Sequence, residues 1–594
     1  METLIQDLRF AVRGLLKRPG FSLVIIVTLA LGIGANTAIF SVVHAVLLAP
    51  LPYPEPSQLV VLSQKNTQKN LSQQPTSYPN LRDWQAQNQC FTHLAALRGE
   101  AMSLTDGTEP ERVSVLRSSV NILSLLGVMP ALGRDFRPDE EEPGKATVAL
   151  IGHGLWQRRY GGNPNLVGQT ITLDGRAFTV IGIMPARLKH PGLVMSSLSP
   201  TGADVWIPLV PLRNEQERTF SNLRAIARLK PGTSLAQAQA EMTAVAVRLE
   251  QQFPNINVYL RIDVEPLHEH LVGRVQQGLW ILTGAVLFVL LIACANVANL
   301  LLARATARQT EIAIRTALGA TRGALMRQLL TECVVLSLLG GGVGLLLAAW
   351  GVPVLTKLSG IPRVDEVGHN APVLMFALLI SLATGLVFGL LPAWQSSRTE
   401  ISGTLKEGRK GSGVTHRRWL SALVVSEIAL ALVLLIGAGL LLRSFRAVSA
   451  IDPGFRVENV LTLAVPLPAA LYPEQAQQVQ FFERVFAAIN ALPGVESSAM
   501  TFRLPIIGFA TAIFTAQGKP VPAGQEAVAD YRAISPAYFR TLGIPLLQGR
   551  EFSDHDNAEA ADAIIINEEL ARRTWPGESP LGKRLQIATE RTRW

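Results

Sequence analysis

Two groups of residues have types and spacings that could bind a metal. His268 and His270 flank Glu269, a spacing that would put both imidazoles on one face of a strand. A zinc site needs a third protein ligand, and none is fixed nearby, so we expect a polar turn beside a membrane span instead. The acidic run 139–142 lacks the spaced oxygen ligands of a calcium loop and is expected to be solvated. The sequence therefore predicts no metal site.

The motifs of nucleotide binding and of acyl transfer are both missing. No G-x-x-x-x-G-K-[ST] motif occurs, because the glycine-rich stretches at 32–34, 340–344 and 411–413 lack the lysine at the required position or lie inside apolar runs. No G-x-S-x-G nucleophile elbow occurs, and Cys90, Cys294 and Cys333 have no C-x-x-C spacing. We therefore expect neither a cofactor nor a catalytic residue in this chain.

Long apolar runs dominate the rest of the sequence. Of its 594 residues, 48% are hydrophobic and only 17% are charged, and the hydrophobic residues are concentrated in five runs. Each run exceeds the roughly 20 residues that an α-helix needs to cross a bilayer. We expect membrane spans at 19–49, 276–303, 328–352, 372–395 and 419–443. Glu427 is a carboxylate well inside the fifth run, close enough to one end to reach water, Arg417 or Arg418.

The basic residues indicate how these spans are oriented. Lysines and arginines gather in residues 1–18, 304–327 and 396–418, and these segments alternate correctly with a single topology. The positive-inside rule then places them, with the N-terminus, in the cytoplasm, and places residues 50–275 and 444–594 outside. Because this topology accounts for the net charge of +9, no nucleic-acid partner is expected.

The first 18 residues predict an amphipathic helix. Such a helix suits the surface of an anionic cytoplasmic leaflet, and a docking surface for a cytoplasmic protein is the alternative. The sequence is compatible with both. The apolar face comprises Leu4, Ile5, Leu8, Val12, Leu15 and Leu16, and the basic face comprises Arg9, Arg13 and Lys17.

The outside segment 50–275 is long enough for its own hydrophobic core. Short β-rich runs at 147–151, 169–173 and 177–183 are divided by turn signals such as Asp174-Gly175. Residues 234–252 predict a helix with a loose apolar face. That face would comprise Ala236, Ala240, Val247 and Leu249. We therefore expect an α+β domain.

The two outside segments repeat one another. Residues 126–136 read LGVMPALGRDF, and residues 542–552 read LGIPLLQGREF. Beyond each come an acidic loop, a β-rich run, a helix with Trp and Arg, and a glycine, which is Gly168 in one copy and Gly582 in the other. Agreement over this length indicates an internal duplication, in which the fifth span is the counterpart of the first. The second unit stops at Trp594 without three return spans, so we expect a truncated second half.

The most specific motif lies between the second and third spans, at residues 291–342. A span continues through Arg304 and Arg308 into a polar helix, where Glu311 and Arg315 stand at i,i+4. Gly319 can end that helix, and Thr321 can cap the next one. With Arg322, these residues predict an elbow between two spans, at 304–327.

Pairs of glycines spaced by four residues follow in the next two spans. Gly340 with Gly344, and Gly385 with Gly389, have the small-xxx-small spacing that lets helix backbones approach closely. They predict a packed helix bundle or a helix dimer face.

The elbow motif and the layout resemble the MacB/FtsX-like permease family of ABC transporters. Residues 276–395 resemble the FtsX-like permease core, residues 50–275 resemble the MacB periplasmic core domain, and the doubled layout resembles the duplicated type of these permeases. The resemblance implies an α-helical protein of the bacterial inner membrane with α+β extracytoplasmic domains and an internal duplication. It also implies that the elbow and the N-terminal helix contact an ABC ATPase, which would be a separate subunit. The elbow residues concerned are Arg304, Arg308, Glu311, Arg315, Gly319 and Arg322.

Two functions are compatible with that resemblance. In the first, ATP hydrolysis by the partner moves the outside domains, for export or for mechanotransmission. In the second, the chain is a membrane-anchored sensor or scaffold whose outside domains bind a ligand or a cell-wall enzyme without transport. Membrane lipid, a dimer or an intrachain pseudo-dimer, and a periplasmic adaptor are the other expected partners. A secondary transporter would need paired intramembrane charges, and the spans offer little beyond Glu427.

Overall fold

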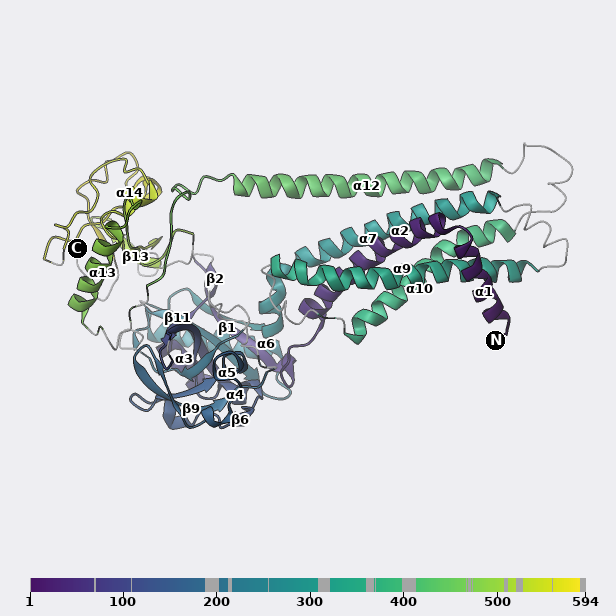
Figure 1. Ribbon diagram of the computed structural model, residues 1–594. Helices are drawn as coiled ribbons and strands as arrows, with labels where there is room; N and C mark the ends of the chain where they lie inside the picture. Colours follow the sequence, from purple (N-terminus) through teal and green to yellow (C-terminus); the bar gives the residue numbers. More distant parts are fainter. Residues whose placement is uncertain are drawn as a thin grey trace. The chain divides into compact units, whose positions relative to one another are not determined.

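A computed structural model of the chain contains a helical unit and a unit built around β-sheets (Figure 1). The helical unit comprises Met1–Leu51 and His268–Ala450, and the sheet unit comprises Pro52–Leu267 and Ile451–Trp594. The structure describes residues 2–68, 71–107, 109–186, 188, 202–211, 216–254, 256–307, 321–358, 368, 370–397, 413–465, 467, 472, 474–506, 511–519, 527–557 and 559–587.

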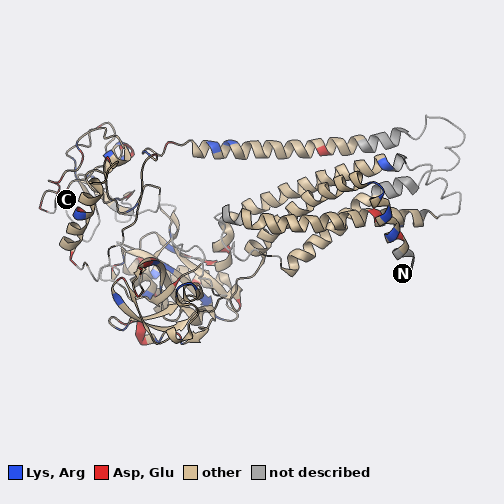
Figure 2. Cartoon of the chain, in the orientation of Figure 1, with Lys and Arg blue, Asp and Glu red and all other residues tan. Residues whose placement is uncertain are grey.

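Among the described residues, five helices of the helical unit are long and apolar enough to cross a membrane. The four later predicted spans each fall within one of them, and the first corresponds to α2 and its π-helical continuation η1. Figure 2 shows how few charged residues lie along them. The helices are α2 (Pro19–Val43) with η1 (His44–Leu48), α7 (Leu267–Ala307), α9 (Arg322–Leu358), α10 (Ala371–Ser397) and α12 (Gly413–Ser449).

The first turn of α7 corrects one expectation. His268, Glu269 and His270 belong to this helix and not to a strand or a turn, so the two imidazoles do not share a face. Among the described residues, no cluster of three His, Cys, Asp or Glu side chains could hold a metal ion.

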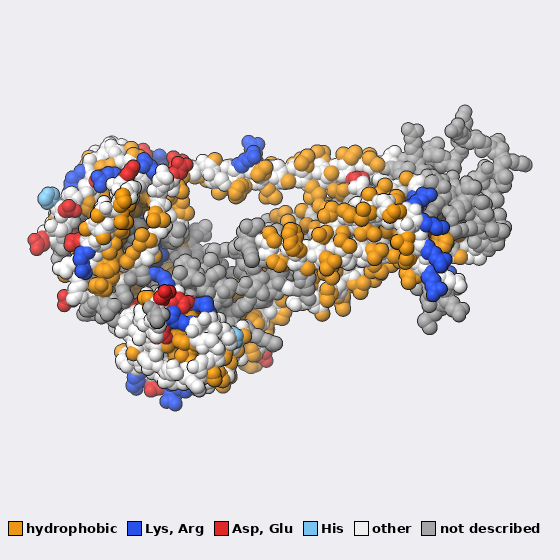
Figure 3. Space-filling view, viewed as in Figure 1, with side chains coloured by type: hydrophobic (Ala, Val, Ile, Leu, Met, Phe, Trp, Pro, Cys, Tyr) orange, Lys and Arg blue, Asp and Glu red, His pale blue; other side chains and the backbone are white. Residues whose placement is uncertain are grey.

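Four of the long helices share a buried core. Leu29 and Ile33 of α2 pack with Cys294 and Val297 of α7 and with Leu336 of α9. By contrast, every described side chain of α12 between 421 and 449 is at least partly exposed. Hydrophobic side chains also cover the visible outer surface of the helical unit, as expected for helices in contact with lipid (Figure 3).

Residues 52–267 form a mixed sheet, which explains the predicted α+β character. The strand order is β12-β1-β11-β4-β5-β10-β7-β9-β6, with β2, β3 and β8 at its sides; β5 runs parallel to β10 and β7 parallel to β9. The strands are β1 (Leu59–Asn66), β2 (Leu71–Gln74), β3 (Thr76–Ser77), β4 (Phe91–Leu104), β5 (Glu111–Ser118), β6 (Leu132–Gly133), β7 (Val148–Ile151), β8 (Thr170–Leu173), β9 (Arg176–Ile183), β10 (Val205–Pro208), β11 (Ser221–Leu229) and β12 (Leu260–Pro266).

Short helices cover this sheet and complete two hydrophobic clusters. Trp84 of α3 and Met242 of α6 join one cluster with β1, β4, β11 and β12, whereas Leu155 of α5 joins the other with β5, β7, β9 and β10. The helical elements are η2 (Pro56–Gln58), α3 (Tyr78–Gln87), α4 (Ile122–Leu126), η3 (Pro138–Glu141), α5 (His153–Tyr160), η4 (Pro164–Leu166) and α6 (Leu235–Gln252).

The apolar face predicted for α6 is largely wrong. Ser234 caps the helix as its N-cap residue, with a glutamine three positions later completing a capping box. Leu249 is buried, but Ala236, Ala240 and Val247 are exposed. The buried face instead follows Ala238, Met242, Val245, Ala246 and Leu249, a tighter i,i+4,i+7,i+8,i+11 pattern.

Residues 451–587 repeat elements of the first domain. Helix α14 corresponds to α4, and both end at a glycine with positive φ, Gly543 and Gly127 respectively. In each case only a residue without a Cβ adopts that left-handed conformation at no steric cost. The elements described here are α13 (Gln475–Asn490), β13 (Thr511–Ala516), β14 (Ala527–Asp530), α14 (Tyr538–Leu542), α15 (Glu568–Thr574) and β15 (Leu585–Ile587).

Candidate functional site

Glycines bring the backbones of α2 and α9 into direct contact. A Cβ atom on Gly34 would lie 2.8 Å from the Gly344 carbonyl oxygen, and one on Gly344 would lie 2.8 Å from the Ala30 carbonyl oxygen. Cβ atoms do not approach backbone this closely, so the contact requires glycine at both positions. Small residues recur every four positions on both helices, as close backbone packing requires. They are Ala30, Gly34 and Ala38 on α2, and Gly340, Gly344 and Ala348 on α9.

A second glycine contact joins α9 to α10. A Cβ atom on Gly385 would lie 3.0 Å from the Val334 Cα, and one on Gly389 would lie 2.9 Å from the Cys333 Cβ. The four glycines to which the sequence assigned helix packing thus lie at two successive helix interfaces. Gly34 was missed, although its spacing from Ala30 and Ala38 carried the same signal.

A polar side chain fixes α2 to α7. The Asn36 amide donates a hydrogen bond to the Val286 carbonyl oxygen of α7 at 2.7 Å and another to the Gly32 carbonyl oxygen at 2.9 Å. Asn36 itself is buried. An amide paired across two helices in an apolar core fixes their register, because any slip would leave a buried polar group without its partner.

Arg304 lies inside the bundle and not on its surface. The residue is only 8% exposed, and its guanidinium carbon lies 4.9 Å from the centre of the Phe21 ring of α2. Glu332 of α9 is likewise buried, at 5% exposed. In this structure Arg304 of α7 therefore lies against α2 inside the helical unit, and its contact with a partner protein stays a prediction.

The remaining elbow residues are mostly beyond what the structure describes. Arg308, Glu311, Arg315 and Gly319 lie outside the described residues, as does the side chain of Arg322. At the start of α9, the Thr321 hydroxyl accepts a hydrogen bond from the Ala324 N–H at 3.3 Å, which confirms the predicted cap.

The arginine that follows a glycine in both repeated segments, Arg134 in one and Arg550 in the other, forms the same clasp in both copies. Arg134 holds Glu140 through two contacts, of 2.5 and 3.1 Å, and the Arg137 N–H donates to the same carboxylate at 2.7 Å. Arg550 holds Asp556 at 2.6 and 2.7 Å, and the Ser553 N–H donates to it at 2.8 Å.

The clasp corrects the reading of 139–142 as a solvated loop. Glu140 is buried in η3, because the bidentate arginine and a backbone N–H satisfy its carboxylate. The two copies share a local structure as well as a sequence motif. In each, the N–H donor and the carboxylate lie at the same distances in sequence from the arginine.

We expect Glu140→Gln to lower the free energy of unfolding of the first outside domain by about 2 kcal/mol, because it replaces a buried charge-assisted pair with a neutral one. Asp556→Asn removes the matching contact in the second copy and should cost less, because Arg550 is the more exposed arginine. Thermal unfolding of the two variants measures the difference. Equal losses would show that burial does not strengthen the first clasp.

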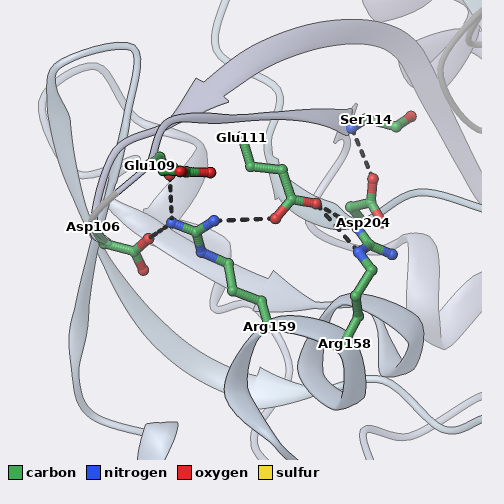
Figure 4. A network of polar contacts seen from close by, with 7 residues as sticks. All are labelled: Asp106, Glu109, Glu111, Ser114, Arg158, Arg159 and Asp204. Atoms are coloured by element: carbon green, nitrogen blue, oxygen red, sulfur yellow. Dashed lines mark hydrogen bonds and ion pairs between the residues drawn. The ribbon is translucent and has the colours of Figure 1, made fainter.

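A second arginine network ties the β4–β5 hairpin to α5 and β10 (Figure 4). Arg159 reaches Asp106 and Glu111 at 3.1 Å each, and Arg158 reaches Glu111 at 2.8 Å. Burial alone would raise the pKa of the Glu111 carboxyl, but hydrogen bonds from both arginines hold that pKa below its ordinary value. Because Glu111 is paired with two arginines and its pKa is lowered, we interpret this network as a structural contact between elements and not as an acid–base site. Arg158 also reaches Asp204, which accepts the Ser114 N–H.

Cys90 is a buried thiol in the first outside domain. Burial, and next the Glu241 carboxylate, raise the pKa of Cys90 to about 12. At pH 8 its thiolate fraction is therefore on the order of a thousandfold lower than that of an ordinary cysteine. We expect iodoacetamide to modify Cys90 at pH 8 in denaturant but not in the native protein, as mass spectrometry of the Cys90 peptide would show. Rapid native modification would contradict the burial.

Family models match most of the chain. The MacB-like periplasmic core domain matches residues 22–245 and again 421–593, and the FtsX-like permease C-terminal domain matches residues 283–401. The two MacB-like segments make up well over half of the chain, and each begins inside a span helix, α2 or α12. The predicted internal duplication of span and outside domain is thereby confirmed.

Two named relatives match about half of this chain. The macrolide export ATP-binding/permease protein MacB of Burkholderia thailandensis is 28% identical over 280 residues, which cover 46% of this chain and 40% of that protein. The pyoverdine export ATP-binding/permease protein PvdT of Pseudomonas syringae pv. tomato is 27% identical over 280 residues, which cover 46% of this chain and 39% of that protein. The chain thus spans less than half the length of these relatives.

Two solved structures resemble parts of the chain. The periplasmic region of MacB from Actinobacillus actinomycetemcomitans has 11% identity and a TM-score of 0.27, covering 38% of this chain and 94% of that one. The extracellular domain of the ABC-type transporter YknZ from Gram-positive bacteria has 12% identity and a TM-score of 0.25, covering 35% and 99%. With both family models matched in order along five apolar helices, the chain belongs to the MacB/FtsX-like family of ABC transporter permeases.

Proposed function

We propose that this chain is the membrane-spanning subunit that couples ATP hydrolysis, on a separate ABC ATPase, to movement of its extracytoplasmic domains. The observation that carries the proposal is the continuity of α7. Strand β12 of the first outside domain ends at Pro266, and α7 begins at Leu267 and continues without interruption to Ala307. At 1.5 Å per residue, this helix is a rod of roughly 60 Å, from a sheet of the outside domain to the start of the elbow.

The bundle around α7 favours rigid transmission of movement. Its contact with α2 is fixed by Asn36, and α2 is fixed to α9 by backbone contacts at Gly34 and Gly344. Helices that touch through backbone atoms have no side chains that could absorb a displacement by changing rotamer. A push on the elbow therefore moves the packed helices together, and a partner ATPase needs only to favour one of two arrangements.

The proposed orientation puts the elbow and the N-terminus in the cytoplasm of a bacterium, and puts both sheet-containing domains outside the plasma membrane. Its support is the distribution of lysine and arginine in the short connecting segments. Because the unit of span and outside domain occurs twice, an intrachain pseudo-dimer is the proposed arrangement, with a periplasmic adaptor as a further partner. The relatives named for macrolide and pyoverdine export favour export over sensing.

Elbow variants can test the coupling directly. We expect a membrane pull-down of the tagged chain to recover an ABC-class ATPase, identified by mass spectrometry, and Arg308→Glu with Arg315→Glu to abolish that recovery. The matched control is Arg443→Glu with Arg446→Glu, an equal change of charge at exposed positions near the far end of α12. If the elbow variant and the wild type retain the same ATPase, the elbow is not the coupling surface. If neither recovers one, the proposed function is wrong.

A further inference from the structure

The N-terminal helix α1 (Glu2–Leu16) is held against the helical unit in one rotation. Ala11 is fully buried and Leu15 nearly so, and the Ser22 hydroxyl of α2 donates to the Leu15 carbonyl oxygen at 3.1 Å. Asp7 forms an ion pair of 2.7 Å with Arg327 of α9. These contacts fix which side chains of α1 face the protein, and therefore which face away.

The free circumference of α1 divides into an apolar arc and a basic arc. Leu8, Val12 and Leu16 are 45%, 43% and 74% exposed, and their four-residue spacing puts them in one row along the helix. The basic arc consists of Arg9, Arg13 and Lys17, each one residue beyond a member of the apolar row and all exposed; Lys17 directly follows α1, and its N–H donates to the Arg13 carbonyl oxygen at 3.2 Å. At 100° per residue the two rows are adjacent.

The basic arc is an unfavourable arrangement for a protein in water alone. Like charges at i,i+4 destabilise a helix, and among the described residues no carboxylate pairs with these three cations, since Asp7 is engaged by Arg327. An anionic partner would remove that repulsion.

The position of α1 indicates which partner this is. Only Lys17 and Arg18 separate α1 from Pro19, where the span helix α2 begins. Helix α1 therefore lies at the surface of the bilayer, where α2 enters its hydrocarbon core. Figure 3 shows Lys and Arg side chains gathered at one end of the hydrophobic surface of the helical unit. A bilayer interface supplies both an apolar layer for Leu8, Val12 and Leu16 and a layer of phosphate beside it.

We propose that α1 binds the headgroups of anionic phospholipids through Arg9, Arg13 and Lys17, with the apolar arc inserted among the acyl chains. The proposal rests on the membrane placement proposed above. It assigns α1 to the lipid and leaves the partner ATPase to the elbow. Because Asp7 is paired with Arg327, five residues into α9, bound lipid would also hold the end of α9 that the elbow enters.

A spin label on α1 of the full-length chain tests this assignment. Gln6 is exposed and lies in the basic arc, and Cys90, Cys294 and Cys333 are buried, so Gln6→Cys offers a selective label. The protein in phosphatidylcholine nanodiscs is compared with the protein in nanodiscs of increasing phosphatidylglycerol content, without nucleotide or ATPase. We expect phosphatidylglycerol to immobilise the label and shield it from an aqueous relaxation agent. Titration with phosphatidylglycerol gives an apparent association constant of α1 for this lipid. Changing all three cations to glutamine should lower that constant on the order of a hundredfold, at about fivefold for each cation.

The matched control changes Arg112, Arg176 and Lys230 to glutamine. These are three exposed cations of the first outside domain, so the net charge falls equally while α1 is untouched. A label indifferent to phosphatidylglycerol, or an equal loss in the control, overturns the proposal. Protection that needs added ATPase would assign the arc to a protein and also overturn it. The main comparison contains no ATPase, and the ATPase is added only in a separate sample, so failure of the lipid proposal leaves the pull-down result unaffected.

Discussion

Replacing Gly34 with leucine will separate α2 from α9 and lower the free energy of unfolding of the protein by about 3 kcal/mol or more. The magnitude follows from the identity of the atoms that would be struck. The nearest atoms to a Cβ at this position all belong to the Gly344 backbone, so no side chain can rotate away to make room. The two helices would have to move apart along the row of small residues that joins them.

Gly342 on α9 provides the control for this prediction. It is exposed, and a Cβ there would meet nothing within 4 Å, so Gly342→Leu should change stability by a few tenths of a kcal/mol at most. Thermal unfolding of both variants in detergent, followed by size-exclusion chromatography with fluorescence detection, compares them. If Gly34→Leu unfolds at the wild-type temperature, the backbone contact does not hold the bundle together.

The second large effect is expected at Arg304. Arg304 and Glu332 are both buried charges of the helical unit, and we expect them to compensate each other, so that replacing Arg304 with glutamine costs about 3–5 kcal/mol, as when one member of a buried pair is lost. The double variant Arg304→Gln with Glu332→Gln removes both charges and should recover much of that loss. A double-mutant cycle therefore gives a favourable coupling energy between the two residues.

Arg443 near the end of α12 is the control for Arg304. It is exposed, and Arg443→Gln should leave the unfolding transition where it is. Additive effects of the two single changes at Arg304 and Glu332 would contradict a shared buried electrostatic site. In that case Arg304 would act through its stacking on Phe21 alone.

Periodicity and spacing predicted the membrane helices and the duplication well, because both depend on patterns repeated over many residues. A run of apolar residues longer than a bilayer has few alternatives to a spanning helix. The segments 126–136 and 542–552 are identical at five of eleven aligned positions, and their arginine clasps bind at the same offsets. The glycine pairs of α9 and α10 were predictable for the same reason, since close helix packing leaves a four-residue spacing in the sequence.

What the sequence could not predict was which polar groups are buried. From the sequence alone Arg304 and Glu140 look like surface charges, because their burial depends on contacts that residue type and spacing do not reveal. Phe21 meets Arg304 from a helix that is far away in sequence. For Glu140, the Arg134 side chain and a backbone N–H supply the hydrogen bonds that make burial tolerable. The prediction of the buried face of α6 was wrong because alanines lie on several sides of this helix, so more than one face fits a loose apolar pattern.

The most direct test of the proposed coupling is to measure whether ATP hydrolysis by the partner moves the membrane spans. Spin labels at Ile281→Cys on α7 and Leu440→Cys on α12, both exposed, report the distance between the first-half bundle and the second-half span in the complex with the partner ATPase. Labels at Leu48→Cys, in the continuation η1 of α2, and at Trp350→Cys on α9 report on the glycine-packed helix pair. We predict that the first distance distribution changes between the nucleotide-free and ATP-trapped complexes, while the second stays the same. An unchanged first distribution in a complex that hydrolyses ATP would contradict it.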